Sequence, residues 1–309
     1  LLADWRLSVT SPAGPDVASL SATSLVRDAL VVSIVLFVGL LVVGLIVVCT
    51  VPRLLATMVR PGAVYPLYSI HYWAHRSITR MTNVPFFTKL FGDSSYIVHY
   101  LYCLGYDVTF EGQTGANFGL NVKHDYPYSV TIGPGTMAAD QLTIVNAEYS
   151  DTWFSVAPVR IGAHSFMGNV VAYPSDAAIG DDCLLASKVL VPIEGDPAEH
   201  LGFLGSPNFE IPRQVERDRE FDDAKRGDRL GELLVAKNRH NRVTIGLYLT
   251  TRWFTTFVSL LVVLAAVDLL ARFGTWAVFG ASISLILFRA LFNVAVERAS
   301  TGFKRLRPT

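Results

Sequence analysis

An aliphatic or aromatic residue recurs at every sixth position over much of the segment from Val108 to Pro192. This period fits neither an α-helix, which has about 3.6 residues per turn, nor a flat strand whose side chains alternate. It is typical of a coil with three short strands per turn, in which the recurring side chains stack in the interior. In the second half of the segment these residues are Ile161, Met167, Tyr173, Ile179, Leu185 and Val191.

A second set of positions, four residues after each recurring residue, should also face inward. It holds small or apolar side chains, namely Ser165, Val171, Ala177, Cys183 and Val189. An earlier run has the same spacing, with Val108, Thr114, Leu120, Tyr126, Ile132, Ala138 and Ile144 as recurring residues and Val130 and Thr136 in the second set. The two registers together predict a left-handed parallel β-helix built from hexapeptide repeats.

Two irregularities interrupt this pattern. The phase slips between Ser150 and Ile161, which predicts a loop or bulge near residues 153 to 158. His124 and Glu148 fall at positions where a small buried residue is expected, and an unpaired charge there would be costly. We therefore expect the coil either to be irregular at these points or to be opened there to build a site.

Three apolar segments predict transmembrane helices around the coil. The first, from Ala29 to Cys49, has no charged residue and is long enough to cross a hydrocarbon core of about 30 Å. The second and third, about Trp253 to Ala271 and Phe273 to Phe292, are separated by a short turn and predict a helical hairpin. The positive mean hydropathy of 0.38 agrees with a membrane protein.

The basic residues orient these spans. They lie after the first span, before the second and after the third, and the hairpin turn has only Arg272. By the positive-inside rule, the coil faces the cytoplasm in a multi-pass protein of the inner (plasma) membrane. The predicted segments are an extracytoplasmic N-terminus (1–28), a transmembrane helix (29–50), an amphipathic interfacial or capping segment (51–107), the repeat domain (108–207), a charged linker helix (208–250), the hairpin (251–293) and a cytoplasmic basic tail (294–309).

Composition and motifs exclude several classes of function. Lys+Arg and Asp+Glu both number 26, so the zero net charge does not indicate a nucleic-acid partner. Cys49, Cys103 and Cys183 show no CxxC spacing, so neither a disulfide framework nor a cysteine zinc site is expected. No glycine-rich phosphate loop or metal-ligand motif occurs, so we predict no metal and no directly bound cofactor.

His124 is the leading candidate for a catalytic base, because an imidazole with a pKa near ~6.5 can take a proton from an attacking amine or hydroxyl. Asp125 could fix its tautomer or hold an ammonium group, although adjacent residues of a strand face opposite sides. Buried contact with a backbone carbonyl is the structural alternative for His124. Candidates for substrate binding are Asn117, Asn121, Asn146, Glu148 and Tyr149, and polar stacking in the coil wall would explain them nearly as well.

His164 and Cys183 are weaker candidates. His164 lies at an outward position of a regular unit. Cys183 occupies a regular inward position and has no feature that would lower its pKa, so we interpret it as buried filling of the core.

The chain resembles the membrane-embedded terminal region of nonribosomal peptide synthetases of the poly-lysine synthetase type. The resemblance covers about residues 25 to 309 and rests on the membrane flanks, the repeat and three motifs. These motifs are Tyr72-Trp73-Ala74-His75-Arg76, the stretch from Phe118 to Asp125, and the stretch from Leu204 to Pro212. The chain departs from the family in having one coil domain and neither an adenylation signature nor a carrier serine motif.

The resemblance implies an acyl or aminoacyl transferase module that joins a carrier-bound aminoacyl thioester to an amine. The donor would be a phosphopantetheinyl carrier thioester or an acyl-CoA. The partners would be the bilayer, carrier and adenylation domains, and similar coil domains in a trimer or pseudo-trimer. Two alternatives stay open, a non-catalytic membrane scaffold and an acyl-CoA-dependent acetyltransferase acting on an envelope glycan.

Overall fold

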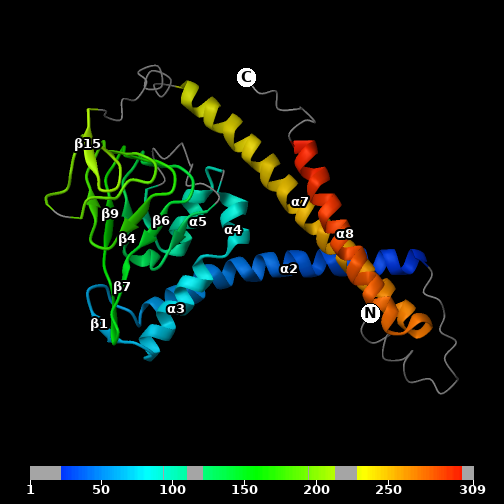
Figure 1. The fold of residues 1–309 in the computed structure, drawn as a ribbon. Helices are drawn as coiled ribbons and strands as arrows, with labels where there is room; N and C mark the ends of the chain where they lie inside the picture. Colours follow the sequence, from blue (N-terminus) through cyan, green and yellow to red (C-terminus); the bar gives the residue numbers. More distant parts are fainter. Residues whose placement is uncertain (1–21, 93, 110–120, 194, 213–227, 301–309) are drawn as a thin grey trace. The chain divides into compact units, whose positions relative to one another are not determined.

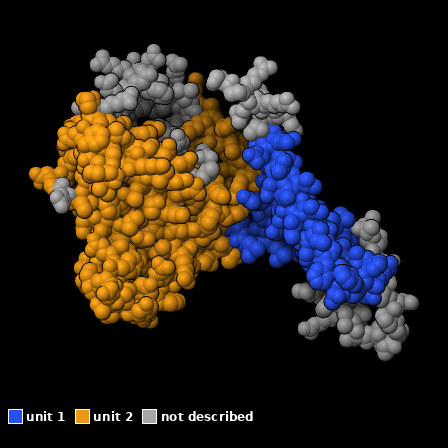
Figure 2. All heavy atoms as spheres, in the orientation of Figure 1, with its two compact units in different colours: residues 1–41, 249–309 blue, residues 42–248 orange. Residues whose placement is uncertain are grey.

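The computed structural model describes residues 22–92, 94–109, 121–193, 195–212 and 228–300. The chain divides into two compact units, and each is described by itself (Figure 2). One unit comprises residues 42–248 and holds every described strand. The other comprises residues 1–41 and 249–309 and holds the described helical hairpin.

Short parallel strands form three sheets in the larger unit (Figure 1). The first sheet is β2 (Asp107–Val108), β4 (Val130–Ile132), β9 (Val159–Ile161) and β12 (Ala178–Ile179). The second is β3 (Lys123–His124), β6 (Thr143–Val145) and β11 (Ala172–Pro174). The third contains β5 (Met137–Ala138), β10 (Phe166–Met167), β13 (Leu184–Leu185) and β14 (Gly202–Leu204).

The strand register shows how these sheets are connected. Along the chain, β9, β10 and β11 each belong to a different sheet, and β12 then returns to the sheet of β9. Phe166 of β10 pairs with Leu184 of β13, so one turn advances the chain from position 166 to position 184. This is the strand order of a parallel coil with three strands per turn. We refer to residues 107–109, 121–146, 157–193 and 195–204 as the coil.

The residues predicted to line the coil interior are buried. Ile161, Met167, Tyr173, Ile179, Leu185 and Val191 are each at most 2% exposed. The second set is buried as well, with Val189 at 4% the most exposed of Ser165, Val171, Ala177, Cys183 and Val189. The two inward registers are therefore confirmed over this part of the chain, whereas Thr114 and Leu120 lie outside the described residues.

The turns of the coil repeat with the same period. A residue with positive φ occurs at every sixth position, at His164, Val170, Asp176, Asp182 and Lys188. The backbone N–H of His164 donates to the carbonyl of Pro134 at 2.9 Å, which ties one turn to the preceding one. The exposed His164 is thus a turn residue of a regular unit.

A sequence insertion explains the phase slip. Thr143 of β6 pairs with Ala172, 29 positions later, instead of the 18 positions that separate Phe166 and Leu184. The extra residues form an antiparallel hairpin, β7 (Ala147–Tyr149) and β8 (Trp153–Val156). The expected loop is therefore a hairpin that starts earlier than predicted, and Glu148 belongs to it rather than to the coil interior.

The hairpin and the N-terminal part of this unit share a second small core. Strand β1 (Val64–Pro66) pairs antiparallel with β8, and helix α3 (Ile70–Thr82) follows, capped by the Ser69 hydroxyl, which accepts from the Tyr72 N–H. The buried residues of this core are Val59, Ala74, Ile78, Tyr126, Ala147, Phe154 and Val156. Helices α4 (Pro85–Phe91) and α5 (Ile97–Leu104) lead from α3 to the first strand of the coil.

The coil continues beyond the end of the repeat pattern. The pattern ends in the sequence after Pro192, yet Gly202 of β14 pairs with Leu184 at the same spacing as within the coil. Strand β15 (Phe209–Ile211) then pairs antiparallel with β14. Strand β14 lies within the predicted repeat domain (108–207), but the repeat pattern does not indicate it, because its buried Phe203 follows a segment without the six-residue motif.

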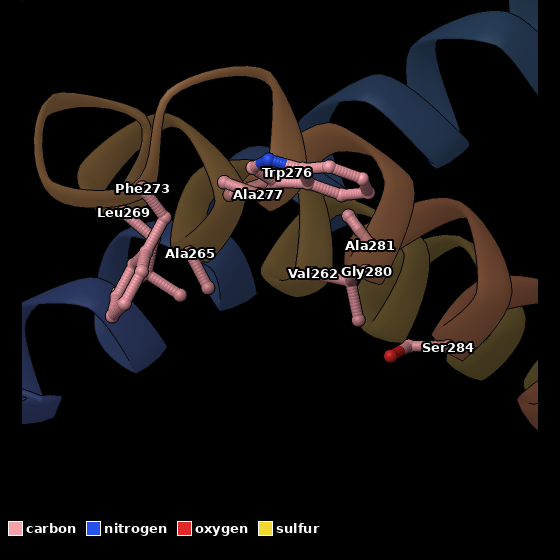
Figure 3. Close-up of a pocket in the computed structure, with 10 residues that line it drawn as sticks. Val262, Ala265, Leu269, Phe273, Trp276, Ala277, Gly280, Ala281 and Ser284 are labelled. Atoms are coloured by element: carbon pink, nitrogen blue, oxygen red, sulfur yellow. The ribbon is translucent and has the colours of Figure 1, made fainter.

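Three described helices are long and apolar enough to cross a membrane, over Ser24–Ala56, Val235–Phe273 and Thr275–Ser300. They belong to α2 (Ala22–Ala56), α7 (Asp228–Phe273) and α8 (Thr275–Ser300). From Asp228 onward, the predicted charged linker and the second span form the single helix α7, whereas Phe209–Ile211 at the start of that linker form strand β15. Between α7 and α8 lies a mainly apolar cavity of about 500 Å³, with Leu269 and Phe273 on one helix and Trp276, Gly280 and Ser284 on the other (Figure 3).

Gly162 offers a direct test of the coil stacking. A Cβ built on Gly162 would lie under 3.0 Å from the backbone of Gly180 in the next turn. We expect Gly162→Ala to lower the free energy of unfolding by about 1–3 kcal/mol, because the two turns must separate. Thermal unfolding of the purified protein in detergent measures the change.

The matched control is Gly246→Ala in α7, where a Cβ meets nothing within 4 Å. This change should be neutral or stabilising by up to about 1 kcal/mol, because alanine favours a helix over glycine. Equal melting temperatures for Gly162→Ala and the wild type would contradict the close stacking of turns.

Candidate functional site

His124 lies inside the coil. It pairs with Ile144, so its side chain occupies the column of large interior residues and not the small-residue position that the sequence indicated. The residue is 4% exposed, its ring meets the edge of Tyr106, and neither ring nitrogen has a hydrogen-bond partner. Burial lowers the pKa of His124 to about 3, so the imidazole is neutral at pH 7.

This placement corrects the expectation that His124 stands at an open groove. The alternation of strand side chains fixes one face for His124 and the other for Asp125, and the register with Ile144 turns His124 inward. Tyr126 leaves the column instead and joins the small core beneath α3, where its hydroxyl donates to the carbonyl of Val59 at 2.8 Å.

A pH-dependent stability follows from the burial of His124. The unfolded residue takes up a proton near pH 6.5 and the folded residue only near pH 3, so stability present at neutral pH is lost as the pH falls between these values. We expect the free energy of unfolding to fall by about 2 kcal/mol from pH 7 to pH 5, because His124 takes up a proton in the unfolded state but not in the folded state. His124→Leu should remove that part of the pH dependence, as measured by chemical denaturation.

The exposed imidazole of His164 provides the matched control, because asparagine tolerates the positive φ of 55° found there. His164→Asn should retain the pH dependence of the wild type. A His124→Leu protein that loses stability between pH 7 and pH 5 as steeply as the wild type would show that this imidazole is not buried in the neutral form.

Asp125 directly follows β3 and is half-buried. Its carboxylate accepts the backbone N–H of Ala147, and Arg76 is close enough to interact with its charge. Partial burial raises the pKa of Asp125 above its ordinary value, and these two contacts partly oppose the shift. The result is a half-buried carboxylate at the junction of the coil, the hairpin and α3.

Tyr149 reaches the same junction from the hairpin. Its hydroxyl and the Nε2 atom of His75 are 2.8 Å apart, and the Arg76 side chain also hydrogen-bonds to it. Burial and the charge of Asp125 raise the pKa of Tyr149, and Arg76 opposes the shift. The residue remains 47% exposed, so part of Tyr149 is accessible from solution.

His75 supports Tyr149 from within the small core. The residue is fully buried, its ring stacks on Phe154 with centroids 5.3 Å apart, and its Nδ1 atom has no partner. Burial, with a smaller contribution from Arg76, lowers the pKa of His75 to about 4, which makes the imidazole neutral at pH 7. We refer to Asp125, Tyr149, His75 and Arg76 as the junction cluster.

Helix α3 is fixed to the coil by several hydrogen bonds near the cluster. The Asn83 amide donates to the carbonyl of His124 at 2.6 Å and accepts from the N–H of the same residue at 3.0 Å. The Thr79 hydroxyl donates to the carbonyl of Asp125 at 2.8 Å. These contacts hold the helix that carries His75 and Arg76 against the strand that carries Asp125.

Asn146 has a structural role in place of the predicted substrate contact. The residue is fully buried, its oxygen accepts the Tyr126 N–H at 2.9 Å, and its amide donates to the carbonyls of Tyr126 and Ala157 at 2.7 and 3.4 Å. Since every polar atom of this amide has a partner within the protein, it cannot bind a substrate without breaking the base of the hairpin.

The other predicted binding residues lie apart from the cluster. Glu148 faces the opposite side of β7 from Tyr149, where the Ser175 hydroxyl donates to its carboxylate at 2.5 Å. Asn121 is an exposed turn residue, and Asn117 lies outside the described residues. The buried Cys183 thiol donates to the carbonyl of Ala198 at 3.0 Å, which agrees with a residue that fills the core.

His75 and Arg76 are site residues that the sequence pattern did not predict. Both belong to the Tyr72-Trp73-Ala74-His75-Arg76 motif, which was assigned to the membrane-proximal segment. The signal that could have identified them is a histidine and an arginine side by side in that aromatic motif. Among the described residues, no group of three or more His, Cys, Asp or Glu side chains is arranged to hold a metal ion.

Comparisons with known proteins show no family. No family model matches the chain, and no curated protein matches it. Among solved structures, a maltose O-acetyltransferase from Clostridium difficile 630 is similar over 46% of this chain and 85% of its own chain, with 17% identity and a TM-score of 0.33.

Proposed function

We propose that this chain is a membrane-bound acyltransferase that transfers an acyl or aminoacyl group from a thioester to an amine at the junction cluster. The observation that carries the proposal is the meeting of a half-buried carboxylate, Asp125, with the hydroxyl of the partly exposed Tyr149, which is hydrogen-bonded to His75 and Arg76. The apolar helices would hold this site at the bilayer surface.

Asp125 is suited to bind and activate the amine. An incoming ammonium group would pair with its carboxylate, whose raised pKa makes it a stronger base than an exposed aspartate. The Ala147 N–H fixes the carboxylate while leaving acceptor positions for the substrate. Asp125 thus keeps its predicted catalytic role and also acts as the general base, a role that the sequence had indicated for His124.

Tyr149 is suited to stabilise the oxyanion. An arginine always donates, and a neutral His75 in its Nε2–H tautomer also donates to the Tyr149 oxygen. With its oxygen accepting these two bonds, the Tyr149 hydroxyl directs its own proton outward. There it would donate to the oxygen that becomes negative in the tetrahedral intermediate.

The proposed reaction balances with these two groups. The bound ammonium group first releases one proton to solvent; the neutral amine nitrogen then forms a bond to the thioester carbonyl carbon and gives a second proton to Asp125. The carbon–sulfur bond then breaks, the carbonyl re-forms, and the departing thiolate takes the proton from Asp125. The products are an amide and a free thiol, and no oxidant, reductant or metal is required.

The donor of the acyl group and the enzyme to which this chain belongs can be proposed from the resemblance. Because His75 and Arg76 lie in the motif that resembles the poly-lysine synthetase type, we infer an aminoacyl donor on a phosphopantetheinyl carrier, within a nonribosomal peptide synthetase. In this form the coil is left-handed, faces the cytoplasm at the inner membrane, and associates with carrier, adenylation and similar coil domains. An acyl-CoA donor with an envelope glycan as acceptor is the alternative for the same thioester chemistry.

Substitution of Tyr149 tests the proposed site. We expect Tyr149→Phe to lower the rate of acyl transfer by about 10²-fold, because the oxyanion loses a hydrogen-bond donor. Asp125→Asn should cause a loss of similar or larger size and remove the acid limb of the pH–rate profile. The assay uses the full chain in detergent, radiolabelled lysyl-pantetheine or acetyl-CoA as donor, and lysine as acceptor.

Two further variants serve as controls. Tyr68→Phe removes a hydroxyl from a side chain that is 89% exposed and should keep full activity. His124→Leu should also remain active, since His124 is enclosed in the coil. Activity with acetyl-CoA alone would favour the alternative donor, whereas folded Tyr149→Phe and Asp125→Asn proteins with wild-type rates would leave a non-catalytic scaffold as the better explanation.

A further inference from the structure

A second cavity lies between α4 and α7 in the larger unit. Its volume is about 300 Å³, and its lining divides into a cation, three polar side chains and an apolar wall. The cation is Lys89, the polar residues are Ser94, Asn241 and Thr244, and the wall consists of Leu90, Ile245 and Tyr248. Such a lining fits an amphipathic molecule with an anionic end.

The α4 side of the cavity adjoins the apolar helix α2. A Cβ added to Gly44 would be 3.3 Å from the Phe87 ring, so α4 contacts the apolar part of α2. Gly44 is five residues before Cys49, the end of the first predicted span, which places this contact about 7–8 Å inside the hydrocarbon. Lys89 is two residues beyond Phe87 on the same short helix.

The α7 side of the cavity lies just outside the second predicted span. Tyr248 precedes Trp253, the start of the second predicted span, by five residues, or about 7–8 Å along the helix. The headgroup layer on each side of a bilayer is about 5–8 Å thick. Tyr248 therefore lies at headgroup level, and Asn241 lies two helical turns further toward the solvent.

The polar lining has a defined hydrogen-bonding character. The Ser94 hydroxyl donates to the carbonyl of Phe91 at 2.8 Å, and the Thr244 hydroxyl donates to the carbonyl of His240 at 2.9 Å. The Asn241 amide donates to the Ser95 hydroxyl at 2.7 Å, which fixes one wall. Because the protons of both hydroxyls are used, their oxygens remain as acceptors for a ligand that donates.

Lys89 supplies the charge for an anion. It has no ion-pair partner within the described parts of the chain, and its side chain is exposed to the cavity mouth. An ammonium group forms strong charge-assisted hydrogen bonds with phosphate oxygens. The lining thus combines a phosphate-binding cation, acceptors for hydroxyl groups and an apolar wall for an acyl chain.

We propose that this cavity binds an anionic phospholipid whose headgroup carries hydroxyl groups, of the phosphatidylglycerol type. The phosphate pairs with Lys89, the headgroup hydroxyls donate to Ser94 and Thr244, and an acyl chain lies along Leu90, Ile245 and Tyr248. This site is distinct from the junction cluster and does not depend on transferase activity. Its occupancy would link α4 to α7 at the membrane surface.

Native mass spectrometry of the full chain in detergent tests the proposal with phosphatidylglycerol and phosphatidylcholine as probes. We expect phosphatidylglycerol to bind at least about tenfold more tightly, and Lys89→Gln to remove most of this preference by loss of one charge-assisted contact. Lys89→Arg should restore it. Lys188→Gln, which removes an exposed lysine from a coil turn, should bind as the wild type does.

Inorganic phosphate separates a lipid site from a site for a free anion. In the proposed site, phosphate at millimolar concentration displaces little lipid, because it makes no contact with the apolar wall. Equal binding of the two lipids by the wild type would overturn the proposal, as would wild-type preference in Lys89→Gln. Saturation by inorganic phosphate without a response to phosphatidylglycerol would also overturn it.

Discussion

The stacking of one backbone turn directly on the next is the constraint on which the structure depends. Parallel strands in a sheet lie about 4.8 Å apart, so each turn of the coil must repeat the path of the turn before it. The close approach of Gly162 to Gly180 shows how little space separates two turns, and buried side chains such as Ile161, Tyr173 and Leu185, one from each of the three sheets, fill the interior. Extra residues can be inserted only at a corner between two strands. There they project from the coil and do not disturb the pairing of strands between turns.

The hairpin at residues 147–156 is such an addition, and it creates the candidate site. Asn146 closes its base by bonding to Tyr126 and Ala157, so the coil resumes its path after the insertion. The hairpin carries Tyr149 outward to the helix that bears His75 and Arg76. A carboxylate from the coil, a hydroxyl from the insertion and two side chains from a preceding helix thereby meet at one junction.

The sequence predicted the coil interior well and the site only in part. A six-residue period reports the inward faces directly, because each unit repeats the same local environment, and Met167, Ile179 and Cys183 are buried as expected. Asp125 and Tyr149 were identified as polar residues near an irregularity. His124 was misplaced because the register of β3 shifts by two residues, which puts it in the column above Ile144 and releases Tyr126 into the second core. No local pattern shows such a shift.

The sequence by itself determined the strand period, the apolar helices and the absence of net charge, because each of these is a property of neighbouring residues along the chain. Only the tertiary structure decided which polar groups meet. His75 and Tyr149 are separated by 74 positions, and their contact at 2.8 Å depends on the hairpin, β1 and α3 packing together. Burial then lowers the pKa of His75 and raises that of Asp125, since a pKa responds to the surroundings in space and not to the order of the residues.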